Sequence, residues 1–218
     1  MTKRYDLIVF DWDGTLVDST HAIVESIQHA AQDAGLPVPG AEASRGIIGL
    51  ELRRAIAELF GEVSDAQIDY LADRYRYHYL VRDHAVPLFE GVAGALAELR
   101  DSGWMLAVAT GKTRRGLERA FDNTGTRQHF LATRCADECH SKPHPQMLEE
   151  LLDELGVEAG RALMIGDTQY DLQMARNAGM DSLAVSYGAQ PLEALLPHGP
   201  RAHFDRFTNM HQWLIINA

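Results

Sequence analysis

Carboxylate, hydroxyl and ammonium groups recur in this sequence at spacings that suit metal and phosphate chemistry. The residues concerned are Asp11, Asp13, Thr110, Gly111, Lys142, Asp167 and Asp171. Carboxylates that pack together repel one another unless a cation lies among them. A site built from oxygen ligands alone suits Mg²⁺ better than zinc, which prefers histidine and cysteine. The pattern therefore predicts a Mg²⁺ site, beside which the lysine, the hydroxyl group and backbone amides would form a phosphate pocket.

The two aspartates of Asp11-Trp12-Asp13 indicate how such a site would act. A carboxylate that faces a metal-bound phosphoryl group can attack the phosphorus atom and form an aspartyl phosphate. A second aspartate two residues away is free to donate a proton to the leaving oxygen. This spacing fits the hydrolysis of a phosphate ester.

Short apolar runs precede several of these residues and are typical of buried parallel strands. The runs cover residues 7–10, 105–109, 162–165 and 182–186, with a weaker one at 130–133. Helical patterns lie between them at residues 90–102, 145–155 and 170–178. This alternation predicts an α/β fold, with a Rossmann-like parallel sheet core flanked by helices. Ligands bind beyond the carboxyl ends of such strands, so the carboxylates are expected to converge there.

Residues 17–86 break this alternation, because they contain no convincing strand pattern. Helical periodicity occurs three times within them instead. A helical stretch of this length after the first strand is too long for an ordinary crossover. We therefore predict an inserted all-α cap domain at residues 17–86, and a Rossmann-like catalytic core made of residues 1–16 and 87–218.

In order and spacing, the chemical segments resemble the four motifs of the haloacid dehalogenase superfamily in its phosphatase form. Residues 11–19 are similar to the first motif, and Thr110, Lys142-Pro143 and residues 166–171 match the other three. The resemblance covers essentially the whole chain, and it is closest to the branch with a helical cap that contains phosphoglycolate phosphatases. It implies a Mg²⁺-dependent phosphatase that hydrolyses small phosphate monoesters through an aspartyl-phosphate intermediate.

The resemblance also implies a role for each matching acidic residue. Asp11 would be the nucleophile and a metal ligand. Asp13 would be the general acid and then the base that activates water, with its backbone carbonyl on Mg²⁺. Asp167 would complete the metal ligands of the protein. Asp171 would orient Lys142 or a metal-bound water.

Four residues are expected to contact the phosphate in the same scheme. Thr110 would hold the phosphoryl oxygens, together with the backbone amides of Trp12 and Gly111. Lys142 would neutralise charge on both the nucleophile and the phosphate. Trp12 replaces the smaller aliphatic residue most often seen between the two aspartates, but the backbone at this position matters more than the ring.

Residues of the predicted cap are candidates for recognising the rest of the substrate. Gly49 would let the cap backbone approach the pocket, and Arg45 or Arg53 could bind a carboxylate of the substrate. The alternative is a plain loop followed by a solvated helix face.

The residues present also bear on other functions within the same superfamily. A dehalogenase would need neither Asp13 nor Asp167, and a phosphonate hydrolase would need a cap lysine, whereas no lysine occurs between Lys3 and Lys112. A sugar phosphomutase shares the core residues and remains an alternative. A non-catalytic binding or regulatory protein that kept the fold is a further alternative. Turnover of a generic aryl phosphate would separate an enzyme from a binder.

Composition restricts the partners and the compartment. The chain has 31 acidic and 20 basic residues, for a net charge of -11, which disfavours binding to nucleic acid or to an anionic membrane. Its start does not resemble a signal peptide, no apolar run is long enough to span a bilayer, and two cysteines cannot form a disulfide framework. We expect a cytoplasmic protein that acts on a small phosphorylated metabolite as a monomer or homodimer.

Two further clusters have a functional and a plain interpretation. Cys135, Cys139, His140 and His144 are either loop residues or a zinc site of unusual spacing. The tyrosines are either a dimer face or a mixture of core and solvated residues; they are Tyr70, Tyr75, Tyr77 and Tyr79.

Overall fold

Six parallel strands form one sheet in the order β3-β2-β1-β4-β5-β6. The strands are β1 (Leu7–Phe10), β2 (Met105–Thr110), β3 (Ala132–Cys135), β4 (Ala162–Gly166), β5 (Asp181–Val185) and β6 (Ala202–Phe204). The computed structural model describes residues 4–83 and 86–218. The first three residues, on which the signal-peptide expectation partly depends, therefore lie outside the described chain.

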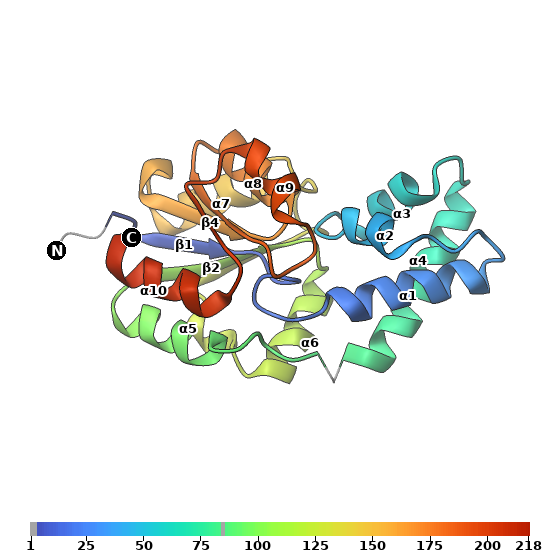
Figure 1. Ribbon diagram of the computed structural model, residues 1–218, viewed down its shortest axis with the longest axis horizontal. Helices are drawn as coiled ribbons and strands as arrows, with labels where there is room; N and C mark the ends of the chain where they lie inside the picture. Colours follow the sequence, from blue (N-terminus) through green and yellow to red (C-terminus); the bar gives the residue numbers. More distant parts are fainter. Residues whose placement is uncertain (1–3, 84–85) are drawn as a thin grey trace.

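Helices cover both faces of the sheet (Figure 1). They are α5 (Val92–Asp101), α6 (Arg114–Thr124), α7 (Gln146–Leu155), α8 (Gln169–Asn177), α9 (Leu192–Leu195) and α10 (Phe207–Asn217). Because successive strand residues point to opposite faces, Ile8 and Phe10 of β1 pack with α5, α6 and α10, whereas Leu7 and Val9 pack with α7 and α8. The predicted α/β class, a parallel sheet flanked by helices, is confirmed.

Four helices lie between β1 and α5 and occupy the region beyond one end of the sheet in Figure 1. They are α1 (Thr20–Asp33), α2 (Ala41–Gly46), α3 (Leu52–Phe60) and α4 (Asp65–Arg82). Their apolar faces pack on one another, since Leu71 of α4 is fully buried in the same apolar cluster as Ile56 of α3. None of the helices in the described part of the chain is long and apolar enough to cross a bilayer.

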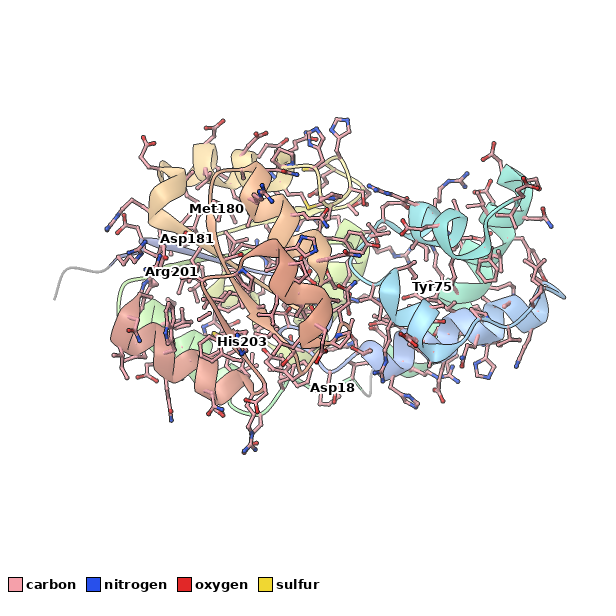
Figure 2. The ribbon with its side chains drawn as sticks, turned by 45° about the horizontal axis from the view of Figure 1, so that its top comes forward. Asp18, Tyr75, Met180, Asp181, Arg201 and His203 are labelled. Atoms are coloured by element: carbon pink, nitrogen blue, oxygen red, sulfur yellow. The ribbon has the colours of Figure 1, made fainter. Side chains whose placement is uncertain are left out.

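Two chain segments join these four helices to the sheet and run side by side. The backbone N–H of Asp18 donates to the carbonyl oxygen of Pro87 at 2.9 Å, and that of Phe89 donates to the carbonyl of Leu16 at 3.0 Å. Asp18 is labelled at this junction in Figure 2. The predicted boundaries of the cap, 17–86, fall at these paired segments, and the division of the chain into two domains stays a prediction.

Some elements differ from the sequence-based expectations. The weak strand expected at 130–133 begins only at Ala132, since a short 3-10 turn ends at His129 and Leu131 is 61% exposed. Strand β6 and helices α2, α6, α9 and α10 have no counterpart among the expected elements. Strand β6 has three residues, none of them fully buried, so it leaves no clear hydrophobic pattern. Helix α6 buries Leu117, Ala120 and Phe121 at helical spacing, which is a short signal that the expected elements do not include.

Two leucines, one in the sheet and one just outside it, provide a test of this packing. Leu163 of β4 is fully buried, whereas Leu131 is 61% exposed just before β3. We expect Leu163→Ala to lower the free energy of unfolding by about 2–5 kcal/mol, because it removes buried methyl groups and leaves a cavity. Leu131→Ala should change it by less than about 0.5 kcal/mol. Urea unfolding followed by circular dichroism measures both, and equal losses would contradict the assigned core.

Candidate active site

The carboxyl ends of β1 and β4 bring three aspartates together. Phe10 of β1 pairs with Ile165 of β4, so Asp11 and Asp167 follow neighbouring strands. Asp171 comes from the first turn of α8. Carboxylate oxygens of the three aspartates lie within 4.8 Å of one another, and all three residues are buried. Negative charges at this spacing repel one another strongly unless positive charge lies beside them.

Lys142 supplies positive charge to this group from the loop between β3 and α7. Its Nζ donates hydrogen bonds to Asp11 Oδ1 and to Asp171 Oδ1, both at 2.7 Å, and its side chain is fully buried. The second oxygen of Asp171 accepts hydrogen bonds from the backbone N–H and the hydroxyl of Thr168, at 3.0 and 2.7 Å. Asp171 is thereby fixed and orients Lys142 toward Asp11.

The pKa values of these groups follow from burial and from their neighbours. Burial raises the pKa of Asp11 to about 7, although Lys142 opposes the shift. Burial, followed by the charges of Asp11 and Asp171, also raises the pKa of Asp167 well above its usual range. Burial would lower the pKa of Lys142, but Asp11 and Asp171 raise it above its usual value. One ammonium group therefore does not balance the acidic cluster.

Asp167 is positioned from two sides by other segments. The Thr15 hydroxyl donates to Asp167 Oδ1 at 2.8 Å, and the backbone N–H of Ala189 donates to Oδ2 at 2.7 Å. Gly14 has a φ of +79°, and a Cβ atom there would overlap the Asp167 carboxylate. The loop after β1 can therefore turn across Asp167 only because residue 14 is glycine.

The acidic cluster fits a hard divalent cation. Asp11 Oδ2 is buried and accepts no hydrogen bond from any described residue, which leaves one carboxylate oxygen available to a ligand. The other members of the cluster, Asp167 and Asp171, also offer carboxylate oxygens, and Mg²⁺ and Ca²⁺ prefer such donors. Among residues 4–83 and 86–218, this is the one group of three acidic, histidine or cysteine side chains that could hold a metal ion.

The zinc alternative at Cys135, Cys139, His140 and His144 has no geometric basis in the described chain, since these side chains form no such group. Cys135 is buried, and the thiol of Cys139 lies 3.7 Å from Glu150 Oε2. The rings of His140 and His144 stack with their centroids 4.5 Å apart. These contacts hold the loop together locally.

A cavity of about 570 Å³ opens from Asp11 and Asp13 between α1, α4 and α6. Lys112 Nζ lies 3.1 Å from Asp13 Oδ1 and donates a hydrogen bond to the Tyr79 hydroxyl at 3.0 Å. Burial would lower the pKa of Lys112, but the charge of Asp13 raises it well above its usual value. Lys112 is not among the site residues predicted from the sequence, although it is one of three lysines and directly follows Gly111.

The phosphate-contacting candidates lie at the same edge of the sheet. Thr110 ends β2, is fully buried, and accepts a hydrogen bond from the backbone N–H of Lys112 at 3.2 Å. Gly111 lines the cavity. The ring of Trp12 packs edge-on against Phe121, with the ring centroids 5.1 Å apart, so this side chain belongs to the core. Phosphate contacts by the amides of Trp12 and Gly111 stay predictions.

Of the three cap candidates, Gly49 alone lies at the cavity. Its carbonyl oxygen would be 2.6 Å from a Cβ atom on Gly111, so the two backbones meet where both residues are glycine. Arg53 instead forms ion pairs with Asp65 and Asp69. Arg45 is exposed, and neither arginine is among the residues that line the cavity. The structure thus places neither arginine where it could meet the substrate in this arrangement.

The four tyrosines of α4 differ in their surroundings, since two line the cavity and two face the solvent. Tyr75 and Tyr79 line the cavity and stack on each other, with centroids 5.7 Å apart. Tyr75 is labelled among the helices of residues 20–82 in Figure 2. Tyr70 and Tyr77 are 48% and 55% exposed. The run is therefore two cavity residues and two solvated ones.

Comparison with known proteins matches residues 8–185 to the family described as haloacid dehalogenase-like hydrolase. The chain is 33% identical over 211 residues to "Probable phosphatase IndB" of Dickeya dadantii, covering 94% of this chain and 91% of that protein. It is 30% identical over 211 residues to "Phosphoglycolate phosphatase" of Mesorhizobium japonicum, with coverages of 93% and 92%. The crystal structure of "a predicted phosphoglycolate phosphatase" from Haemophilus somnus has the same fold, with a TM-score of 0.86, 24% identity, and coverages of 97% and 99%. The chain belongs to the haloacid dehalogenase-like hydrolases.

Proposed function

We propose that this chain is a Mg²⁺-dependent phosphatase that hydrolyses small phosphate monoesters through an aspartyl phosphate on Asp11. The proposal rests on the different surroundings of the two carboxylate oxygens of Asp11. Lys142 holds its Oδ1 at 2.7 Å, while the buried Oδ2 has no hydrogen-bond donor among the described residues. The same residue lines the cavity beside Asp13. The phosphatase names of its relatives support this choice.

In the first half of the reaction, a carboxylate oxygen of Asp11 attacks the phosphorus atom of the ester. The bond between phosphorus and the leaving oxygen breaks as the new bond forms. Asp13 donates its proton to the leaving oxygen, so that an alcohol departs rather than an alkoxide. Lys142 neutralises negative charge on Asp11 and on the phosphoryl group, and Asp171 keeps its ammonium group in place.

In the second half, water attacks the phosphorus atom of the aspartyl phosphate. Asp13, which has lost its proton, now accepts one from the water. The bond between Asp11 and phosphorus breaks, which releases inorganic phosphate and restores the Asp11 carboxylate. Thr110 and the backbone amides of Trp12 and Gly111 would hold the phosphoryl oxygens through both halves.

Asp11, Asp167 and the backbone carbonyl of Asp13 would hold the Mg²⁺ ion. Asp171 has the positioning role instead, because its Oδ1 pairs with the Lys142 ammonium group and its Oδ2 already accepts two hydrogen bonds from Thr168. When bound, the ion supplies positive charge that offsets the repulsion between the Asp11 carboxylate and the phosphate. The helices at residues 20–82 would act as a cap that excludes water from this charged site.

Substitution of the two aspartates tests the assigned roles. Asp11→Asn should abolish phosphate release without unfolding the protein, because the amide cannot form the intermediate. Asp13→Asn should slow release by about 10²–10⁴-fold, and esters with leaving groups of low pKa should suffer least. Steady-state rates on p-nitrophenyl phosphate and on an alkyl phosphate measure both effects. Asp18→Asn is the matched control, since Asp18 is an exposed carboxylate of the same segment. Equal losses of Asp13→Asn on good and poor leaving groups would contradict the acid role.

The raised pKa of Asp11 predicts a pH-dependent stability when metal is chelated. A carboxyl whose pKa rises from 3.8 to about 7 on folding stabilises the folded state at low pH. That contribution is lost as the pH rises through the folded-state pKa. We therefore expect the free energy of unfolding in EDTA to fall between about pH 5 and pH 8, and Mg²⁺ to restore it at the higher pH.

Urea unfolding at both pH values, with EDTA and with Mg²⁺, measures this dependence. Asp11→Asn serves as the control, because it removes the titrating group and should show a smaller fall with pH. The same fall in the variant and the wild type would show that Asp11 is not responsible.

A further inference from the structure

We infer that the preferred substrates are phosphate monoesters whose leaving group is bulky and apolar rather than short and acidic. This inference rests on the proposed phosphatase function and adds the class of its substrate. It concerns the cavity that opens from Asp11 and Asp13, and the leaving group would be the part of the substrate that fills this cavity.

The size of the cavity exceeds what a phosphoryl group and a two-carbon alcohol require. Its volume of about 570 Å³ lies in the range of pockets that enclose whole drug-sized ligands. Aliphatic side chains from three helices and the loop before α3 line a large part of its wall. The main ones are Ile23 and Ile27 of α1, Ile48, Leu50, Ala55 of α3 and Leu80 of α4.

The charged residues of the cavity offer little to an acidic leaving group. Lys112 is the cation next to Asp13, but Asp13 already pairs with it at 3.1 Å. Two lining arginines also have acidic neighbours: Arg119 pairs with the buried Asp83 at 3.2 Å, and Arg76 pairs with Asp73 at 2.9 Å on the exposed surface of α4. A carboxylate placed near the phosphate would therefore add a negative charge beside Asp13, whose neighbouring cation is already paired.

Arg115 is the exception among the described lining cations, since its side chain has no acidic partner there. It is exposed on α6 and so faces water, where a charged pair contributes little. An acidic leaving group would gain only a weak, solvated contact from it.

Two tyrosine rings, those of Tyr75 and Tyr79, also line the cavity. The hydroxyl of Tyr79 accepts the hydrogen bond of Lys112 at 3.0 Å, and the Lys112 ammonium lies 4.7 Å from the centre of its ring. Tyr75 stacks on Tyr79 with an interplanar angle of 21°. With its hydroxyl already bonded, Tyr79 adds ring surface to the aliphatic wall, and burying an apolar group against this wall is favourable.

A series of n-alkyl phosphates from ethyl to hexyl tests the inference. The leaving alcohols have nearly the same acidity, so the chemical step is held constant while the buried area grows. Each methylene group that enters the cavity should raise kcat/KM by about fourfold. 2-Phosphoglycolate, a short acidic ester, should have a lower kcat/KM than hexyl phosphate.

Two neighbouring residues of α4 supply the matched variants. Leu80 and Val81 are both exposed apolar residues, at 43% and 70%, but only Leu80 lines the cavity. Leu80→Gln should lower the ratio of kcat/KM for hexyl phosphate to that for ethyl phosphate by several-fold. Val81→Gln should leave this ratio at the wild-type value, which controls for an added polar group on the same helix.

The outcomes separate this inference from the proposed function. A flat chain-length profile, or phosphoglycolate preferred over hexyl phosphate, would overturn the inference, while turnover that is lost in Asp11→Asn would still support the phosphatase. Equal ratios in the Leu80 and Val81 variants would also overturn it. Release of phosphate from none of these esters would overturn both the function and the inference.

Discussion

The contact between Lys142 and two buried carboxylates is the interaction on which the rest of the site depends. An ion taken out of water costs several kcal/mol unless it is closely paired. Nζ of Lys142 meets Asp11 and Asp171 at 2.7 Å each, which requires β1, α8 and the loop before α7 to meet at one point. The parallel sheet makes this possible, because its strands end at a common edge. The remaining negative charge, centred on Asp11 and Asp167, favours a bound cation, and that cation would in turn attract a phosphate.

The strands that carry the site could be predicted because they are buried on both faces. Runs such as residues 7–10 and 162–165 are apolar without interruption, and such runs have few alternatives to a central parallel strand. Elements at the periphery of the sheet were not predicted in this way. Strand β6 is short and half-exposed, so its place is set by packing against the sheet rather than by a pattern of its own. Helix α6 is mostly polar, and its one signal is the short apolar face of Leu117, Ala120 and Phe121.

The site shows the same division between local and long-range information. Asp11 and Asp167 directly follow predicted parallel strands, so their convergence at one edge of the sheet could be predicted from the sequence. The partnership of Lys112 with Tyr79 depends instead on how α4 lies over the end of β2, which no periodicity encodes. Arg53 is a candidate for binding a substrate carboxylate on sequence grounds, yet it pairs with acidic residues of α4 that lie more than ten positions away along the chain. Long side chains are placed by partners that sequence spacing does not reveal.

Calorimetric titration of Mg²⁺ at pH 7 shows whether the carboxylates of this cluster bind a divalent cation. Titration in two buffers that differ in ionisation enthalpy counts the protons released on binding. The raised pKa values of Asp11 and Asp167 predict one saturable site whose occupation releases protons, with weaker binding and less release in Asp11→Asn. No saturable binding, or equal affinity and equal proton release in wild type and variant, would contradict the account.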